Sequence, residues 1–191
     1  MMIDITQHDS TPAPGDLVVL QRFLNLHEHD AEGVEHDPPL EMVRTYLVDG
    51  GLLAPKERFT ETERETYLEL RRALRALILT NEGEPLSPAD AQVIDRLAVE
   101  AELHPHFHAE RAPTLEPRGE GVAAAFGQIV AIAFVAAFDG TFAHLKTCAS
   151  EDCRAVFFDR SKNHSGRWCS MEVCGNRAKV RAWRERQKVT R

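Results

Sequence analysis

The spacing of four cysteines constrains this chain more than any other feature. The chain of 191 residues contains four cysteines, and they form two C-x4-C pairs: Cys148 with Cys153, and Cys169 with Cys174. A thiolate is a soft ligand, and two close pairs separated by enough chain for a hairpin are typical of a closed tetrahedral zinc site. We therefore predict one structural Zn²⁺ ion held by all four cysteines.

Two other uses of these cysteines have to be weighed. Two disulfide bonds would consume the same four residues, but nothing at the start of the sequence resembles a signal peptide, and disulfides rarely persist in the cytosol. His144 and His164 are alternative metal ligands close in sequence. Because four thiolates leave no coordination position for a histidine or a substrate, we expect the metal to be structural rather than catalytic.

The residues between and after the cysteine pairs predict the local fold. Residues 154–158 form a short β-type run, residues 159–166 indicate a turn, and residues 167–169 lead back toward the metal. Residues 177–184 contain good helix formers and no proline, which predicts a helix. This order is typical of a treble-clef-like finger. Val180 and Trp183 are expected to pack back onto its hairpin.

The C-terminal part is basic and the remainder is acidic. Residues 146–191 contain twelve Lys and Arg against five Asp and Glu, a net charge of +7, whereas the whole chain carries −7 and the preceding part therefore −14. This asymmetry predicts a polyanionic partner, although a solvated basic helix is the alternative. The candidate nucleic-acid-binding residues are Arg160, Lys162, Arg167, Arg177, Lys179, Arg181, Arg184, Arg186 and Lys188.

Three segments carry a family resemblance. Residues 148–153, 158–163 and 167–180 resemble the CGNR zinc finger, which is named for the run that here is residues 174–177. That finger closes bacterial proteins with an N-terminal ABATE domain, a family of stress-induced transcription regulators. The rest of the chain is similar to an ABATE domain in length and in the order of its elements. The resemblance implies a cytoplasmic regulator with DNA as its partner.

The N-terminal part has the pattern of a helical domain. Expected elements are a helix at 40–47, a long helix opened by a capping box at Thr60–Glu63, a helix capped at Ser87, a small β-hairpin over 104–116, and an apolar helix over 122–138. The apolar stretch is too short and too interrupted to predict a membrane span. The predicted fold class is mainly α with a small β-hairpin (α+β): a helical domain over 1–141, closely packed on a treble-clef-like finger over 142–191.

Two groups of histidines are further candidates for binding. The residues Asn25, His27 and His29 form a candidate ligand pocket, since the family has an Asn-containing run at this place, although His27 and His29 depart from its common pattern. His104, His106 and His108 would share one strand face. A metal is a weaker interpretation for the first group, because these histidines lie in a segment whose residues indicate a loop, where histidines are usually only solvated. It is also weaker for the second group, because no further ligand is evident opposite that strand face.

Three classes of function were compared. A DNA-binding regulator fits best, with the helical domain binding a small-molecule effector or mediating assembly as a homodimer. A module that binds RNA or an acidic protein surface is the alternative. We expect no enzymatic activity, since the sequence has no nucleophile–base pair and no glycine-rich phosphate loop.

Overall fold

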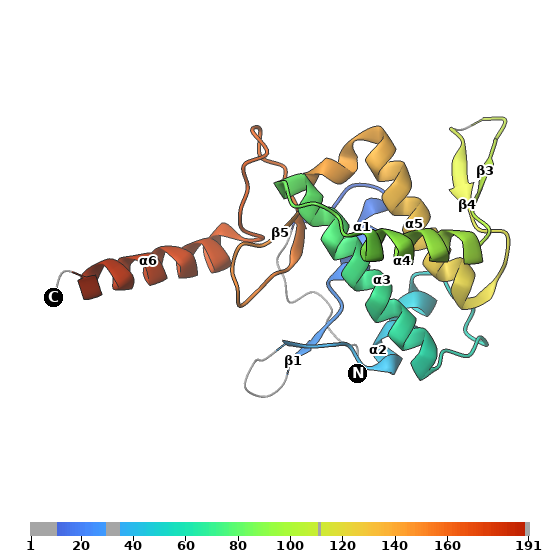
Figure 1. The fold of residues 1–191 in the computed structure, drawn as a ribbon, viewed down its shortest axis with the longest axis horizontal. Helices are drawn as coiled ribbons and strands as arrows, with labels where there is room; N and C mark the ends of the chain where they lie inside the picture. Colours follow the sequence, from blue (N-terminus) through green and yellow to red (C-terminus); the bar gives the residue numbers. More distant parts are fainter. Residues whose placement is uncertain (1–10, 30–34, 111, 190–191) are drawn as a thin grey trace.

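The computed structural model describes residues 11–29, 35–110 and 112–189, and helices α1 to α5 form the body of this part of the chain (Figure 1). They are α1 (Leu17–Leu24), α2 (Leu40–Asp49), α3 (Glu61–Leu79), α4 (Pro88–Glu100) and α5 (Gly121–Asp139). Short 3-10 turns follow α3 and α5, namely η1 (Thr80–Glu82) and η2 (Thr141–His144), and a π-helical turn, η3 (Met171–Gly175), leads into α6 (Asn176–Val189). The mainly helical fold class is confirmed.

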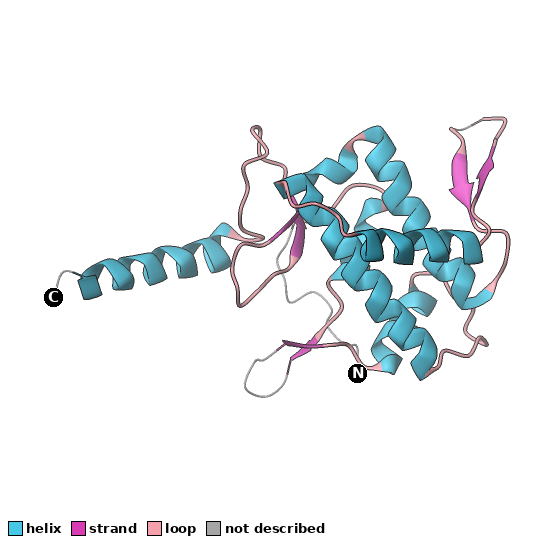
Figure 2. Ribbon diagram, in the orientation of Figure 1, coloured by secondary structure: helices cyan, strands magenta, loops and turns pink. Residues whose placement is uncertain are grey.

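The strands lie at the periphery of this helical body (Figure 2). Within the described residues they form antiparallel pairs: β1 (Glu28–His29) with β2 (Glu35–His36), β3 (His104–His106) with β4 (Thr114–Glu116), and β5 (Leu145–Thr147) with β6 (Val156–Phe158). The hairpin predicted over 104–116 is therefore confirmed. β1 and β2 lie in a segment for which the sequence indicated only a loop.

Local sequence signals explain where α3 and α4 begin. Thr60 and Glu63 form the predicted capping box at the start of α3. At α4, the Ser87 hydroxyl accepts a hydrogen bond from the Asp90 backbone N–H, and Pro88 occupies the first turn. Both arrangements satisfy backbone donors that have no partner inside the helix.

The apolar faces of α1, α3 and α5 meet in one core. α3 contributes Tyr67, Leu70, Leu74 and Ile78, all fully buried, and the Tyr67 hydroxyl donates to the carbonyl of Phe23 at 3.0 Å. α5 is long and apolar enough to cross a membrane by length and composition alone, and 56% of its most apolar window is buried. Its buried residues contribute to the same core, as expected for the central helix of a folded domain.

The C-terminal segment docks on the helical body through β5 and β6. Leu145 and Val156 are fully buried in the same apolar cluster as α1 and α3. The Asn25 side chain accepts from the Val156 N–H and donates to its carbonyl, each at 2.7 Å. The Asn81 amide likewise donates to the Phe142 and Leu145 carbonyls at 2.9 and 3.0 Å. The predicted close packing of the two parts is confirmed.

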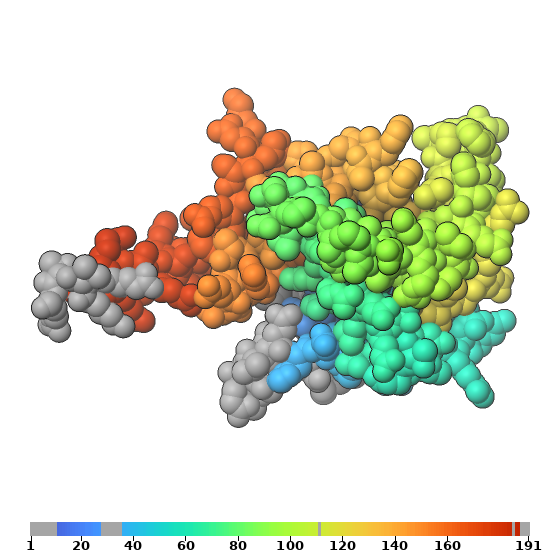
Figure 3. Space-filling view, viewed as in Figure 1, coloured from blue at the N-terminus to red at the C-terminus, as the bar shows by residue number. Residues whose placement is uncertain are grey.

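Two details of the predicted finger are wrong. β6 pairs with β5, which precedes the first cysteine, and not with residues 167–169. α6 extends away from the body as a separate rod (Figures 1 and 3), so Val180 and Trp183 stay 47% and 56% exposed instead of packing on the hairpin. An amphipathic pattern indicates which residues share a helix face, but not whether a partner covers it.

Gly127 allows α5 to approach the end of α4. A Cβ atom built on Gly127 would lie 2.2 Å from the Cβ of Ala101, whereas one built on Gly119 would meet nothing within 4 Å. In the Gly127→Ala variant the helix-propensity gain is about 1 kcal/mol, but the overlap forces the helices apart. We expect a net loss of about 1–3 kcal/mol in the free energy of unfolding, measured by urea denaturation. Gly119→Ala is the control, and an unchanged stability of Gly127→Ala would contradict this packing.

Candidate metal centre

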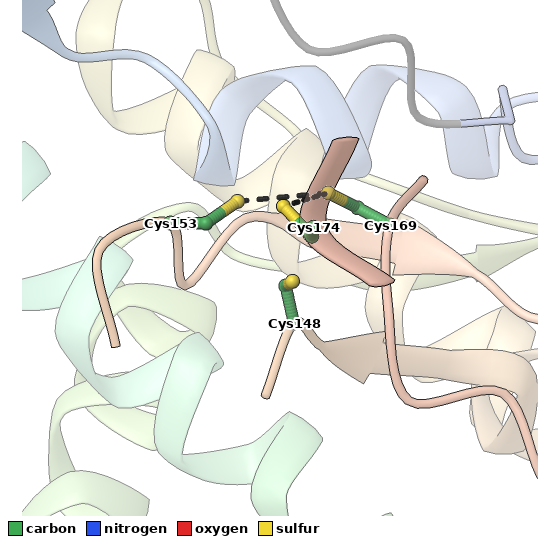
Figure 4. A group of neighbouring side chains, drawn as sticks. All are labelled: Cys148, Cys153, Cys169 and Cys174. Atoms are coloured by element: carbon green, nitrogen blue, oxygen red, sulfur yellow. Dashed lines mark hydrogen bonds between the residues drawn. The ribbon is translucent and has the colours of Figure 1, made fainter. Parts of the chain in front are cut away.

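The four cysteine side chains meet at one buried point (Figure 4). Cys148 follows β5, Cys153 lies in the turn before β6, Cys169 lies in the following loop, and Cys174 belongs to η3. Their exposed fractions range from 0 to 9%, and all four are free thiols. Their sulfurs lie within 4.8 Å of one another, which brings together every residue of the predicted ligand set.

The sulfur spacing fits a zinc ion. The Cys169 Sγ atom lies 3.5 Å from that of Cys153 and 3.6 Å from that of Cys174. Four sulfurs placed tetrahedrally at a Zn–S distance of about 2.3 Å would be about 3.8 Å apart. An all-sulfur donor set suits Zn²⁺ and leaves no coordination position open, so it can hold a fold together but cannot activate a water molecule.

The electrostatics of the cluster also favour a cation. Hydrogen bonds from the Cys153 and Cys169 thiols lower the pKa of Cys148 far below its ordinary value. The same contact with Cys148 raises the pKa of Cys153 to about 12, and it raises the pKa of Cys169 still further. A thiolate at Cys148 is therefore favoured, and the thiols of Cys153 and Cys169 resist ionisation until a positive charge lies among them.

The motif around Cys174 has a steric and a polar component. A Cβ on Gly175 would lie 2.9 Å from the Met171 sulfur and 3.4 Å from the Trp168 ring, so a larger residue here would have to displace the Met171 side chain. The Asn176 amide donates to the Glu172 carbonyl at 3.0 Å. These contacts fix the direction in which α6 leaves the cysteine cluster.

A buried carboxylate, which the sequence reasoning did not single out, braces the loop between β6 and Cys169. Asp159 accepts from the N–H groups of Ser161 at 2.9 Å and Gly166 at 2.8 Å, and from the Lys146 ammonium at 3.0 Å. Burial alone would raise the pKa of Asp159, but these hydrogen bonds outweigh burial and lower it below the usual range. An Asp followed two residues later by Ser is a turn signal, and it was available in the sequence.

Most of the predicted nucleic-acid-binding residues lie on the exposed surface of the finger and α6. Arg160 donates to the Pro12 carbonyl at 2.9 Å, and the Arg167 guanidinium lies 5.4 Å from the centre of the Trp168 ring. The exposed members are Arg160, Lys162, Arg167, Arg177, Lys179, Arg181, Arg184 and Arg186. The side chain of Lys188 lies outside the part that the structure describes.

Arg181 differs from its neighbours because it folds back on the finger. Its guanidinium lies 2.6 Å from the Asp152 carboxylate and 3.7 Å from that of Glu151. An open groove of about 680 Å³ lies beside this contact, and Val173, Arg177 and Arg184 are among its lining residues. The ion pair links α6 to the turn that carries the first cysteine pair, a contact that sequence spacing did not predict.

The predicted ligand-pocket residues lie in the segment that leads from the end of α1 to β1. The Asn25 amide is engaged with Val156, as described above. His27 is half-buried, and the side chain of His29 lies outside the described residues. A ligand role for these three stays a prediction. His144 and His164 are paired with each other, with their Nδ1 atoms 2.9 Å apart, and lie apart from the cysteine cluster.

The geometry of the four buried cysteines is that of a zinc-finger protein. Comparison with known proteins agrees with this assignment. A family model for the CGNR zinc finger matches residues 144–187, and the ABATE model, described as "Putative stress-induced transcription regulator", matches residues 15–140. No curated protein matches the chain. The chain belongs to the ABATE family and ends in a CGNR zinc finger, whose four buried cysteines hold one structural zinc ion.

Removing one ligand should unfold the finger. Metal binding at such sites supplies folding free energy on the order of 10 kcal/mol. We predict that Cys169→Ser loses the zinc and that backbone amides from Cys148 onward exchange rapidly with solvent. Amides of α3 and α5 should keep their protection, as measured by hydrogen–deuterium exchange, if the helical domain over 1–141 is independent. Loss of protection throughout the chain would contradict that division.

Replacing Asp159 should weaken the loop without touching the metal. Asp159→Asn leaves the Lys146 ammonium, whose side chain is only 14% exposed, without a carboxylate, so we expect a loss of about 3 kcal/mol in urea unfolding. The pKa of Asp159 in the folded protein lies below its value of about 3.9 in the unfolded chain, so its carboxylate stabilises the fold above about pH 3.9. This stabilisation is lost only as the pH falls through the pKa of the folded state. The loss should therefore be similar at about pH 7 and about pH 5. Asp95→Asn, an exposed site on α4, is the control, and an equal effect there would contradict this role.

Proposed function

We propose that this protein is a transcription regulator that binds DNA through its finger and α6. The observation that carries the proposal is a zinc-anchored helix that projects from an acidic body and exposes Arg177, Lys179 and Arg184. Arginine and lysine side chains on a rigid helix are suited to phosphate oxygens and to base edges. Family membership supports the regulatory role.

Charge separation supports the same orientation of binding. The part before Lys146 carries −14 and the remainder +7. A polyanion attracts one end of the molecule and repels the other, so the finger should approach the duplex while the helical body stays away from it. The helical body is then available to bind an effector or a second copy of the chain.

Arg181 has a positioning role in this proposal. Its contacts with Glu151 and Asp152 neutralise part of its charge and tie α6 to the first cysteine pair. Arg177 and Arg184 lie on the same side of α6 at helical spacing and remain available for phosphates. Because one short helix offers few base contacts, we expect a homodimer at a specific DNA site.

Duplex binding should depend on three exposed cations and on salt. About six phosphate contacts would give a slope near −5 for log affinity against log salt. The triple variant Arg177→Ala, Lys179→Ala, Arg184→Ala should bind duplex DNA more weakly and flatten that slope by about 3. Fluorescence anisotropy over a salt series measures both quantities, with Lys56→Ala on the helical body as the control. Unchanged affinity and slope would contradict the proposal, and tighter binding to competing RNA would favour an RNA partner.

A further inference from the structure

The β3–β4 hairpin brings a carboxylate opposite the predicted stripe of histidines. Its register pairs His104 with Glu116 and His106 with Thr114, so side chains of these residues share one face of the hairpin. The Nδ1 atom of His106 lies 2.8 Å from one Glu116 oxygen, and the Nε2 atom of His108 lies 3.5 Å from the other. The further ligand that the sequence did not reveal is therefore supplied by the opposite strand.

These donor distances match a single metal ion. The three ligand atoms lie within 4.8 Å of one another. Imidazole nitrogen and carboxylate oxygen bind zinc-like ions at about 2.0–2.2 Å, which places neighbouring donors about 2.8–3.6 Å apart, from octahedral to tetrahedral angles. The observed 2.8 and 3.5 Å lie within this range, so an ion could replace the present contacts with small side-chain movements.

Neighbouring residues hold the carboxylate in place. The Thr114 hydroxyl donates to Glu116 at 2.6 Å and lies 2.8 Å from the His108 Nε2 atom. The hydrogen bonds from Thr114 and then His106 lower the pKa of Glu116 to about 2, so the carboxylate is ionised at neutral pH. His104, beside His106, has a buried Nδ1 atom that makes no hydrogen bond within the described residues. Metal ligands whose orientation is fixed by a neighbouring side chain, as Thr114 fixes Glu116 and His108, are typical of functional metal sites.

We propose that His106, His108 and Glu116 form a second metal site that binds a divalent transition-metal ion. Two imidazoles and one carboxylate favour ions such as Zn²⁺, Co²⁺, Ni²⁺ or Cu²⁺ over Mg²⁺ and Ca²⁺. Three protein ligands leave coordination positions for water or an exogenous ligand, so this ion should exchange with solvent, unlike the ion held by four sulfurs.

The location makes the second site independent of the first. The hairpin lies at the opposite end of the molecule from α6 (Figure 1), and β4 packs against α5. A metal ion bound there would occupy the helical body, which is the part proposed above to bind an effector. The metal-binding proposal does not depend on whether α6 binds DNA.

Calorimetric titration of the full-length, zinc-loaded protein with Ni²⁺ tests the site. We expect one added equivalent of Ni²⁺ with no release of zinc, measured by elemental analysis of the same sample. His106→Ala, His108→Ala and Glu116→Gln should each weaken Ni²⁺ binding by about 10-fold or more. His36→Ala and Glu84→Gln, at exposed positions in other segments, should bind as the unaltered protein does.

Histidine NMR signals identify the ligands independently of the variants. Paramagnetic Ni²⁺ should broaden the imidazole signals of His106 and His108 at lower Ni²⁺ concentration than the signals of His144 and His164. Circular dichroism checks that each variant keeps its helices. The proposal is overturned if no added equivalent binds, if Ni²⁺ uptake equals zinc release, or if the three variants bind Ni²⁺ as tightly as the two controls.

Discussion

Attraction between four sulfurs and one cation is the interaction on which the finger depends. The finger has a small buried cluster of its own, in which the four cysteines are metal ligands. The other buried members of this cluster are the apolar residues Ala155 and Phe157. So few apolar groups cannot offset the conformational entropy of some forty ordered residues. The zinc ion takes the place of a hydrophobic core, and Cys174 connects it directly to the start of α6.

The strand β6 joins this metal cluster to the helical body. Its side chains alternate, so that Ala155 and Phe157 face the cysteines while Val156 enters the main core. The Asn25 amide completes the hydrogen bonding of Val156 from the side of α1. The direction of α6 is therefore set relative to the whole molecule, which gives a fixed separation between the acidic body and the basic helix.

Sequence reasoning succeeded where the signal was local. The cysteine spacing, the capping box at Thr60 and the hairpin over 104–116 all depend on residues close in the chain. It failed where a contact joins distant segments: Asn25 with Val156, Arg181 with Asp152, and Glu116 with His108 across a register that the turn alone did not specify. It also assigned Trp183 a packing partner, because helical periodicity identifies a face but not what lies against it.

The central claim is that sulfur alone binds the zinc and that this ion fixes α6. The most direct measurement is X-ray absorption at the zinc edge, on protein purified under reducing conditions and dialysed to remove exchangeable metal. The account predicts one zinc per chain with four sulfur neighbours at about 2.3 Å. Protein without zinc, or zinc with nitrogen or oxygen among its nearest neighbours, would contradict it.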